Sequence, residues 1–382
     1  MKNKTKTKPF IIIATHAVFV GNDAVFGPGH AVSAYLSNES IPHSYIIHSL
    51  YDARPTLIVE KNTKQERILK KSFSKILPGH LRYPFEILTT ILYIIGQGDV
   101  DVFIGLNPLN TIAGIIAKNM GHVKKVVFYT ADYAHKRFDN SFLNSIYHAI
   151  DRFALKNSDE IWNVSSRITE LRKKQISNKK NITIPNTPVF ENMTQYTSSK
   201  KKNHSLVVMA NFTPAIEYEL IVEAIAELKK KYSDIFISFI GSGPKEEAIR
   251  KQVAKEHLET NVIFHGFKTH EEAMKIVAVH QIGLALYANQ FSWTEFGDSL
   301  KAREYLALGL PVLINDHIST TDDITKYNAG IAFKLTKKKL VQIIDTIFSD
   351  SKIYSKLSSN ATKMAKENDL KILLDLHLKP LL

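Results

Sequence analysis

The stretch Glu295–Asp316, EFGDSLKAREYLALGLPVLIND, contains a short helix with its own start and stop signals, followed by an apolar strand. Asp298 or Ser299 can cap the start of the helix, because a side-chain oxygen there accepts hydrogen bonds from backbone N–H groups in the first turn. Gly309 suits the left-handed residue after the last turn, and Pro311 prevents the helix from continuing. The order of helix, tight turn and apolar strand predicts an α/β fold.

The same alternation runs through the whole chain. Apolar, β-branched runs such as Pro9–Thr15 and Ile235–Ile240 are separated by amphipathic helical segments. Strands that alternate with helices form parallel sheets with helices on both faces, and near-continuous apolar strands fit sheets that are covered on both sides. We therefore predict an α/β architecture of two doubly wound, Rossmann-like domains with a cleft between them. Ligands of such sheets bind beyond the carboxyl ends of the strands.

The length of 382 residues suits about two domains. The polar stretch 187–203 lacks both helical and strand periodicity, so we predict a linker there. It separates an N-terminal domain, residues 1–186, from a C-terminal domain, residues 204–367. The apolar, helical tail 368–382 is expected to cross back onto the first domain.

Charge is distributed unevenly along the chain. Residues 1–186 carry 25 Lys and Arg against 14 Asp and Glu, a net charge of +11, whereas the remainder carries +2. A basic half favours an anionic partner, although solvated lysines explain the same number. The chain has no cysteine, which excludes disulfides and thiolate metal sites. No apolar run is long enough to span a membrane, and the first one reads better as a buried strand than as a signal peptide.

The helix that follows Ser299 has the chemistry of a nucleotide site. Its amino end offers free N–H groups and a positive dipole end, which can hold a diphosphate. Lys301 adds a point charge for phosphate, and Ser299 can donate one more hydrogen bond. Glu304 lies on the same helix face and can accept hydrogen bonds from the two hydroxyls of a ribose. Taken alone, Lys301 and Glu304 are better explained as an ordinary exposed ion pair.

The surrounding pattern resembles the donor-binding signature of glycosyltransferase family 4, S-x-K-x-x-E-Y-L-A-x-G-x-P-V. The matching residues are Ser299, Lys301, Glu304, Tyr305, Leu306, Ala307, Gly309, Pro311 and Val312. Three earlier segments resemble the same family in order and spacing. They contain Asn211 after the first strand of the C-terminal half, the glycine turn with Gly241 and Gly243, and the stretch around the nucleobase with His265, Gly266 and Phe267.

This resemblance implies a GT-B fold, a nucleoside-diphosphate-sugar donor, no required metal or other cofactor, and retention at the anomeric carbon. Two departures stand out. Many members have two glutamates seven residues apart, and the first contacts the transferred sugar. Here that position is Phe296, so either Glu295 takes the role through a shifted loop or a backbone group at Gly297 or Asp298 replaces it. The loop Asn211–Glu219 also lacks the Arg and Lys that many members use for the diphosphate, which leaves Lys301, the helix end and Arg303.

Two positions in the N-terminal half are candidates as well. Gly27 and Gly29 follow the first strand, and in the family this place is a glycine-rich loop near the donor phosphates or the acceptor; a plain strand-to-helix turn explains them equally. Asp132 follows another predicted strand and falls where an acidic or histidine residue faces the reacting sugar in the family. It can orient a substrate or accept a proton, or act only as a loop cap.

The segment Lys61–Leu77 has the pattern of a basic amphipathic helix, with one apolar stripe flanked by basic residues. The stripe is Ile68, Leu69, Phe73, Ile76 and Leu77, and the flanking residues are Lys64, Arg67, Lys70, Lys71 and Lys75. Such a helix can lie on an anionic membrane or pack on its own domain.

From these observations we expect an enzyme that transfers a sugar to a polysaccharide, a glycolipid or a lipid-linked acceptor. We expect it in the cytoplasm, with peripheral contact at the inner face of the cell membrane if the basic helix binds lipid. No nucleic-acid-binding motif appears. The alternatives are a nucleotide-sugar 2-epimerase of the same architecture and a non-catalytic protein that only binds a nucleotide sugar.

Overall fold

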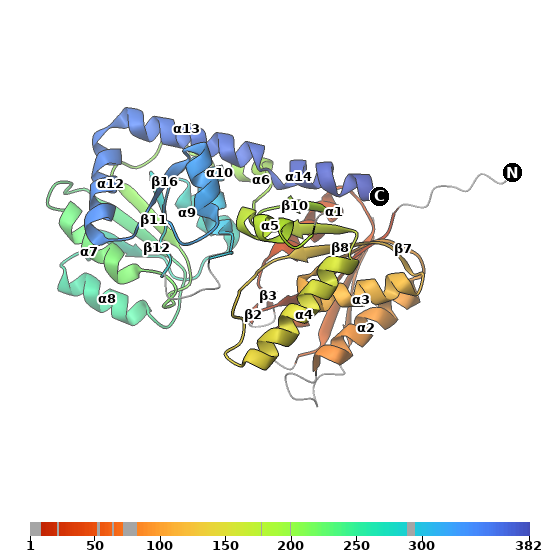
Figure 1. Cartoon of the computed structure of the whole chain (residues 1–382). Coiled ribbons are helices and arrows are strands. Elements are labelled where there is room, and N and C mark those ends of the chain that lie inside the picture. The colour runs from red at the N-terminus through yellow and green to blue at the C-terminus, as the bar shows by residue number, and fades with distance from the viewer. Residues whose placement is uncertain are drawn as a thin grey trace. The chain divides into compact units, whose positions relative to one another are not determined.

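The computed structural model describes residues 9–20, 23–51, 54–62, 65–71, 82–176, 178–198, 200–288 and 295–382. They form two compact units (Figure 1). One unit contains residues 1–185 together with 371–382, and the other contains residues 186–370. The stretch 187–203, expected as a linker, lies in the second unit and includes a short helix, α6 (Phe190–Thr194).

The N-terminal unit is built on a sheet whose described strands run in the order β10-β9-β8-β7-β1-β4-β5-β6. Five of its strand pairs are parallel, and the pairs β4–β5 and β5–β6 are antiparallel. Strand β1, IIIATHA, is buried along almost its whole length, which explains its nearly continuous apolar sequence. The strands are β1 (Ile11–Ala17), β4 (His43–Ser49), β5 (Thr56–Lys61), β6 (Glu66–Lys71), β7 (Val100–Leu106), β8 (Val123–Thr130), β9 (Glu160–Asn163) and β10 (Lys180–Thr183).

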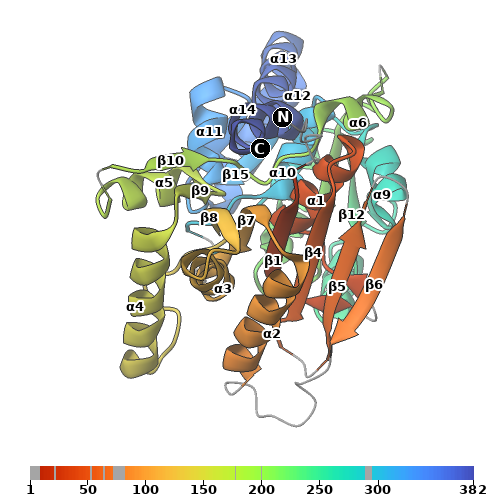
Figure 2. The same cartoon turned by 90° about the vertical axis from the view of Figure 1, so that its right-hand side faces the viewer.

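Helices cover both faces of this sheet, and a small two-stranded ribbon follows β1 (Figures 1 and 2). The ribbon consists of β2 (Phe19–Val20) and β3 (Asp23–Ala24). The helices are α1 (Pro28–Asn38), α2 (Arg82–Gln97), α3 (Asn107–Asn119), α4 (Ser141–Asn157) and α5 (Ser166–Lys173). Helix α14 (Leu370–His377) and a 3-10 helix (Lys379–Leu381) complete the unit. Tyr35 of α1 donates a 2.6 Å hydrogen bond to Asp375 of α14, which fixes this tail on the first unit.

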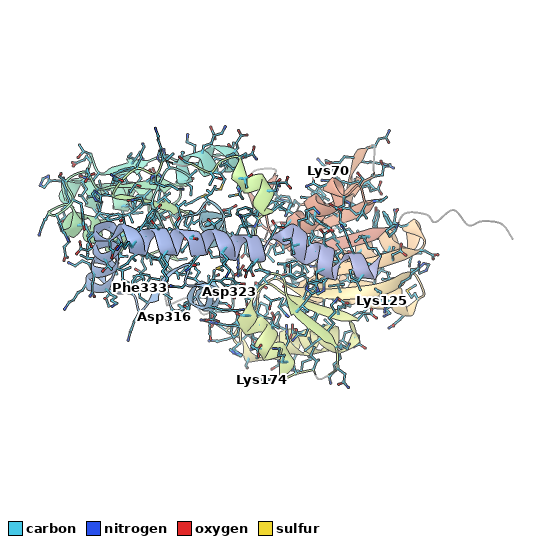
Figure 3. The ribbon with its side chains drawn as sticks, turned by 90° about the horizontal axis from the view of Figure 1, so that it is seen from above. Lys70, Lys125, Lys174, Asp316, Asp323 and Phe333 are labelled. Atoms are coloured by element: carbon cyan, nitrogen blue, oxygen red, sulfur yellow. The ribbon has the colours of Figure 1, made fainter. Side chains whose placement is uncertain are left out.

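The basic helix expected over Lys61–Leu77 is wrong for its described residues. They form the end of β5 and all of β6, an antiparallel hairpin whose turn is closed by the Asn62 side chain, which accepts a 2.8 Å hydrogen bond from the backbone N–H of Gln65. Ile68 is exposed and Leu69 is half-buried, because neighbouring side chains of a strand point to opposite faces. Lysines such as Lys70, which points away from the unit in Figure 3, protect this sheet edge from further pairing. Residues 72–77 lie outside the described part of the chain.

The C-terminal unit has a six-stranded parallel sheet in the order β13-β12-β11-β14-β15-β16. Its strands are β11 (Ser205–Met209), β12 (Phe236–Ile240), β13 (Val262–Phe264), β14 (Ile282–Ala285), β15 (Val312–Asn315) and β16 (Gly330–Phe333). Its helices besides α6 are α7 (Tyr218–Leu228), α8 (Glu246–Lys255), α9 (His270–Val277), α10 (Leu300–Ala307), α11 (Thr320–Tyr327), α12 (Lys337–Ser349) and α13 (Ser351–Glu367). The order of β11, β12 and β13 reverses direction at β14, so the carboxyl ends of β11 and β14 flank the switch point where ligands of such sheets bind.

Helix α10 matches the helix expected from the sequence. Ser299 is its N-cap and accepts a hydrogen bond from Ala302 N–H, and Gly309 has the left-handed φ of +74° after the C-cap. Tyr305 anchors the helix on the sheet, because its hydroxyl accepts a 2.6 Å hydrogen bond from Met209 N–H at the end of β11. The ring lies over Gly283 of β14, where an added Cβ would come within 2.3 Å of the ring. Only glycine leaves room for this anchor.

This packing predicts that Gly283→Ala destabilises the protein by about 1–3 kcal/mol, the usual cost of overpacking a tight contact. Urea unfolding followed by circular dichroism measures the change. Gly96→Ala in α2 is the matched control: an added Cβ meets nothing within 4 Å there, so this helical substitution should be neutral or stabilising. Equal effects of the two variants would contradict the role given to Gly283.

A candidate nucleotide-sugar site on the C-terminal unit

The loops that follow β11, β12 and β13 lie against one another at the carboxyl edge of the sheet. Phe212 N–H donates to Ser242 C=O at 3.1 Å, and Gly241 N–H donates to Gly266 C=O at 2.9 Å. Added Cβ atoms at Gly241 and Gly243 would come within 2.2 and 2.6 Å of the carbonyl oxygens of Ala210 and Phe212. Both positions therefore require glycine, because the backbone of the preceding loop lies too close for a Cβ atom. The structure thus brings Asn211 and this glycine turn together, as well as the stretch that begins at His265.

The residues after β13 differ in exposure. Gly266 has a left-handed φ of +65°, and the Phe267 side chain is 76% exposed. His265 is half-buried and shares a 3.0 Å hydrogen bond with Ser238 of β12. Burial lowers the pKa of His265, with the charges of Lys268 and Lys202 adding to the effect. A neutral imidazole beside an exposed aromatic ring can contact an uncharged, planar group such as a nucleobase.

Glu304 of α10 is buried, with 4% of its surface exposed. Its Oε1 accepts a 2.7 Å hydrogen bond from His270 Nε2, at the first residue of α9. This contact joins α10 to the loop after β13, so the carboxylate lies close in the fold to the stretch His265–Phe267. The hydrogen bond raises the pKa of His270, although burial acts in the opposite direction. No local pattern predicts this pair, because the two residues are 34 positions apart.

Lys301 is half-buried at the start of α10. Burial lowers the pKa of its ammonium group, and the charge of Glu304 acts in the opposite direction. Lys301 and Glu304 therefore do not point away into bulk water, which argues against an ordinary exposed ion pair. A partly desolvated cation and a buried carboxylate, one helical turn apart, can bind a phosphate and a diol respectively.

Ser299 is buried, and its hydroxyl is already engaged. It caps Ala302 N–H and shares a 2.6 Å hydrogen bond with Tyr287. The Ser299 side chain thus stabilises the helix start, while the helix end itself still presents backbone N–H groups without intrahelical acceptors.

The contacts of Arg303 argue against the role in neutralising the leaving group that was expected from the sequence. Its buried guanidinium donates to both carboxylate oxygens of Asp298 and to Asp323 of α11, each at 2.7 Å. Asp298 is 1% exposed at its side chain and also accepts hydrogen bonds from Thr320 and from Asn186 N–H. Figure 3 labels Asp323 on α11. The carboxylate of Asp298 is therefore held inward. Its carbonyl accepts from the Asn186 side chain, so it too is engaged.

Glu295 is half-buried, and Phe296 is buried with 7% of its surface exposed. Residues 289–294, which lead into Glu295, lie outside the described part of the chain. With Asp298 fixed by Arg303, Glu295 and the backbone of Gly297 remain the candidates for contact with the transferred sugar.

The N-terminal unit has its own cavity of about 200 Å³ at the carboxyl ends of β1 and β7. Gly27, Gly29, His16, His30 and Asn107 are among its lining residues. Sequence reasoning gave no role to His16 or Asn107; the left-handed φ of +64° at Asn107 is a backbone signal that only a structure can supply.

The surroundings of two histidines in this cavity differ. His16 Nε2 donates to Glu86 at 2.9 Å and its Nδ1 lies 3.0 Å from the Asn110 amide, so both ring nitrogens are engaged. Burial lowers the pKa of His30 to about 4, with a contribution from Lys61, and the ring is neutral at pH 7. Of the described lining residues none is a carboxylate or a lysine.

Asp132 comes directly after Ala131, which lines this cavity. Its carboxylate accepts a 2.6 Å hydrogen bond from Arg137, and 42% of its side chain is exposed. The ion pair orients the carboxylate and favours a positioning role over proton transfer. No group of three or more His, Asp or Glu side chains that could hold a metal ion occurs within the described ranges.

Arg303 gives a prediction about stability. Arg303→Gln leaves Asp298 buried without its charge partner, so we expect a loss of about 3–5 kcal/mol in the free energy of unfolding. Chemical denaturation measures it. Lys251→Gln removes the exposed Lys251–Glu247 pair of α8 and should change stability by less than about 0.5 kcal/mol. A stable Arg303→Gln protein would show that the guanidinium is not a structural centre.

The His270–Glu304 pair gives a prediction about pH. A histidine whose pKa is raised in the folded state contributes its full stabilisation at pH values below the ordinary histidine pKa of about 6.5. This contribution is lost as the pH rises through the pKa of the folded state. The destabilisation caused by His270→Asn should therefore be larger at pH 6 than at pH 8.5. In a Glu304→Gln background the same substitution should lose this pH dependence. A pH-independent effect in the wild-type background would contradict the pairing.

Comparison with known proteins supports the fold and gives a family match for the C-terminal unit. Residues 189–364, slightly less than half of the chain, match the family described as glycosyl transferases group 1. No curated protein sequence matches the chain. Among solved structures, Anabaena HepE in complex with UDP has a TM-score of 0.69 at 11% identity, over 97% of this chain and 98% of HepE. Sucrose-phosphate synthase from Thermosynechococcus elongatus has a TM-score of 0.69 at 14% identity, over 98% and 99% of the two chains.

A mutant of S. aureus TarM, solved with UDP, fondaparinux and α-GlcNAc-glycerol, has a TM-score of 0.59 at 14% identity. The similarity covers 85% of this chain but only 62% of TarM, less than two thirds of its length. At these identities the structures establish the fold alone, and membership in family 4 stays a prediction. Residues 189–364 match the family of glycosyl transferases group 1, and the chain has the two Rossmann-like units of the GT-B fold.

Proposed function

We propose that this enzyme transfers a sugar, with retention at the anomeric carbon, from a nucleoside-diphosphate sugar to a polysaccharide, a glycolipid or a lipid-linked acceptor. The buried Glu304 carboxylate, one turn behind the capped amino end of α10 and half-buried Lys301, is the observation that carries the proposal. The donor ribose binds Glu304, and its diphosphate binds Lys301 and the α10 amino end. No metal or other cofactor enters this proposal.

The remaining donor contacts follow from the loops at the same sheet edge. Gly241 and Gly243 allow the backbone to approach the donor closely, and Asn211 lies beside them. His265, Gly266 and Phe267 flank the nucleobase. The complexes of HepE and TarM with UDP make a UDP-sugar the first donor to test.

Catalysis then depends mainly on stabilising the negative charge of the departing diphosphate. Lys301 and the helix end are suited to this, since Arg303 is already neutralised by two aspartates. Glu295 is proposed to contact the transferred sugar.

We place the acceptor on the N-terminal unit, at the cavity with Gly27 and Gly29, with Asp132 orienting it. Inversion by direct displacement needs a base at the acceptor hydroxyl. The carboxylate of Asp132 is held in an ion pair by Arg137, which suits an orienting role rather than proton transfer, and both nitrogens of His16 are engaged. These contacts support retention.

A lipid-linked or glycolipid acceptor lies at a membrane, so we also propose that the enzyme works in the cytoplasm in peripheral contact with an anionic membrane surface. No described helix is long and apolar enough to cross a bilayer.

Glu304→Gln tests the donor site. It removes a charged acceptor of ribose hydrogen bonds, so donor affinity should fall by about 1.5–3 kcal/mol, roughly 10- to 150-fold. Calorimetry across UDP-, GDP- and ADP-sugars measures this, and the same panel identifies the base. Glu247→Gln, an exposed glutamate of α8, is the control and should bind normally.

Unchanged donor affinity and unchanged transfer in Glu304→Gln would refute the assignment. Chromatography of products distinguishes the rival functions. Conversion of the free donor without any acceptor would indicate a 2-epimerase, and binding without turnover over a broad acceptor panel would indicate a non-catalytic protein.

A further inference from the structure

Three neighbouring helices of the N-terminal unit expose large apolar side chains. Helix α3 packs against both α2 and α4, and Figures 1 and 2 show the three helices side by side. Phe85, Leu88 and Leu92 lie exposed on α2, and Phe142, Ile146 and Phe153 lie exposed on α4. The exposed fractions reach 56% for Leu92 and 70% for Phe142. Isolated exposed apolar residues are ordinary, but a concentration on adjacent helices marks an interaction surface.

Helix α4 has apolar residues on its exposed side as well as on its buried side. Its inward side is satisfied, because Ala154 and Leu155 are buried in the core of the unit. Its one acidic residue, Asp151, is also buried and accepts a bidentate pair of hydrogen bonds from Arg172 of α5 at 2.5 and 2.7 Å. The outward side therefore carries the exposed apolar residues together with Arg152 and Lys156, and no exposed carboxylate.

The other two helices add apolar surface without negative charge. The two residues of α2 that carry a charge at neutral pH, Arg82 and Glu86, are buried, so its exposed face is uncharged. Met120 follows α3 and is 53% exposed. Beyond the end of α4, Lys179 donates hydrogen bonds to the carbonyls of Lys156 and Ser158, which places another cation at that end of the helix.

The charge of this surface indicates which kind of partner binds it. In a symmetric dimer the same face meets itself, so Arg152 and Lys156 would find no exposed carboxylate on α2, α3 or α4 to pair with. An anionic lipid surface complements both features, because acyl chains accept the apolar side chains and head groups attract the flanking cations.

We propose that the outward face of α2, α3 and α4 is a membrane-docking surface for anionic lipids. Aromatic and aliphatic side chains of α2 and α4 enter the head-group boundary, and Arg152 and Lys156 contact lipid phosphates. This rests on the membrane contact proposed above and assigns it to a surface other than the hairpin β5–β6. It does not depend on the donor site, because lipid binding is measurable without nucleotide.

Flotation of the full chain with vesicles tests the proposal. Wild-type protein should float with vesicles of phosphatidylcholine containing phosphatidylglycerol, bind at least tenfold more weakly to pure phosphatidylcholine, and dissociate as salt rises. Phe142→Ser combined with Phe153→Ser should lower binding at least tenfold. Arg152→Gln combined with Lys156→Gln should remove most of the preference for the anionic lipid.

Matched controls come from exposed residues of the C-terminal unit. Ile263→Ser on β13 and Lys251→Gln combined with Lys255→Gln on α8 should leave flotation unchanged. All substituted side chains are exposed, so circular dichroism and thermal unfolding should match the wild type, and donor binding in solution should persist.

Three results would overturn the proposal. The first is wild-type protein that floats with neither kind of vesicle. The second is a Phe142→Ser, Phe153→Ser protein that floats as well as the wild type. The third is a dimer in analytical ultracentrifugation that these two substitutions convert to a monomer, since the face would then bind a second copy. Protein that binds the donor normally but does not float with vesicles leaves the transferase proposal intact. Protein that floats with vesicles but does not bind the donor contradicts the donor site and leaves the membrane proposal intact.

Discussion

The buried guanidinium of Arg303 is the contact on which the site depends. It joins Asp298, immediately before the cap of α10, to Asp323 on the following helix, and both links are 2.7 Å long. Two carboxylates compensate one buried cation, and Thr320 and Asn186 satisfy more of the lone pairs of Asp298. A buried charge network of this kind is costly to disturb, because removing one member leaves the others unpaired in a low-dielectric environment. The start of α10 is therefore fixed before any ligand binds.

Because of helical geometry, neighbouring residues of α10 have different roles. Successive residues are about 100° apart around an α-helix, so Lys301 and Glu304 project on one side, while Arg303 projects about 160° away from Lys301. The inward side holds the helix in place, and the other side carries a half-buried cation and a buried carboxylate. Tyr305 adds the anchor to β11 through Met209. A nucleotide then meets groups that are already positioned, so little ordering is required on binding.

Local signals explain what the sequence predicted well. Ser299, Gly309 and Pro311 act within a few residues of α10, and the helix ends where these residues indicate. Long-range contacts explain what it missed. The partners His270 and Glu304 are far apart in the chain, and the cavity with His16 and Asn107 depends on which strands become neighbours. The prediction for the segment around Ile68 was wrong for another reason. Its short basic sequence matched the spacing of a helical stripe, whereas the turn at Asn62 and the pairing with β5 make it a strand.

The positive charge of the N-terminal half also needs a structural interpretation. Several of its lysines are paired, since Lys118 and Lys125 lie within 4 Å of Asp159 and Lys124 lies 2.7 Å from Asp101. Net charge alone therefore overstates the cationic surface that a partner meets. Burial of Asp151 by Arg172 has the opposite local effect, because it removes the only carboxylate of α4 from the surface and leaves Arg152 and Lys156 beside exposed phenylalanines. A basic amphipathic surface thus arises from which carboxylates the core buries, and periodicity within one segment cannot reveal it.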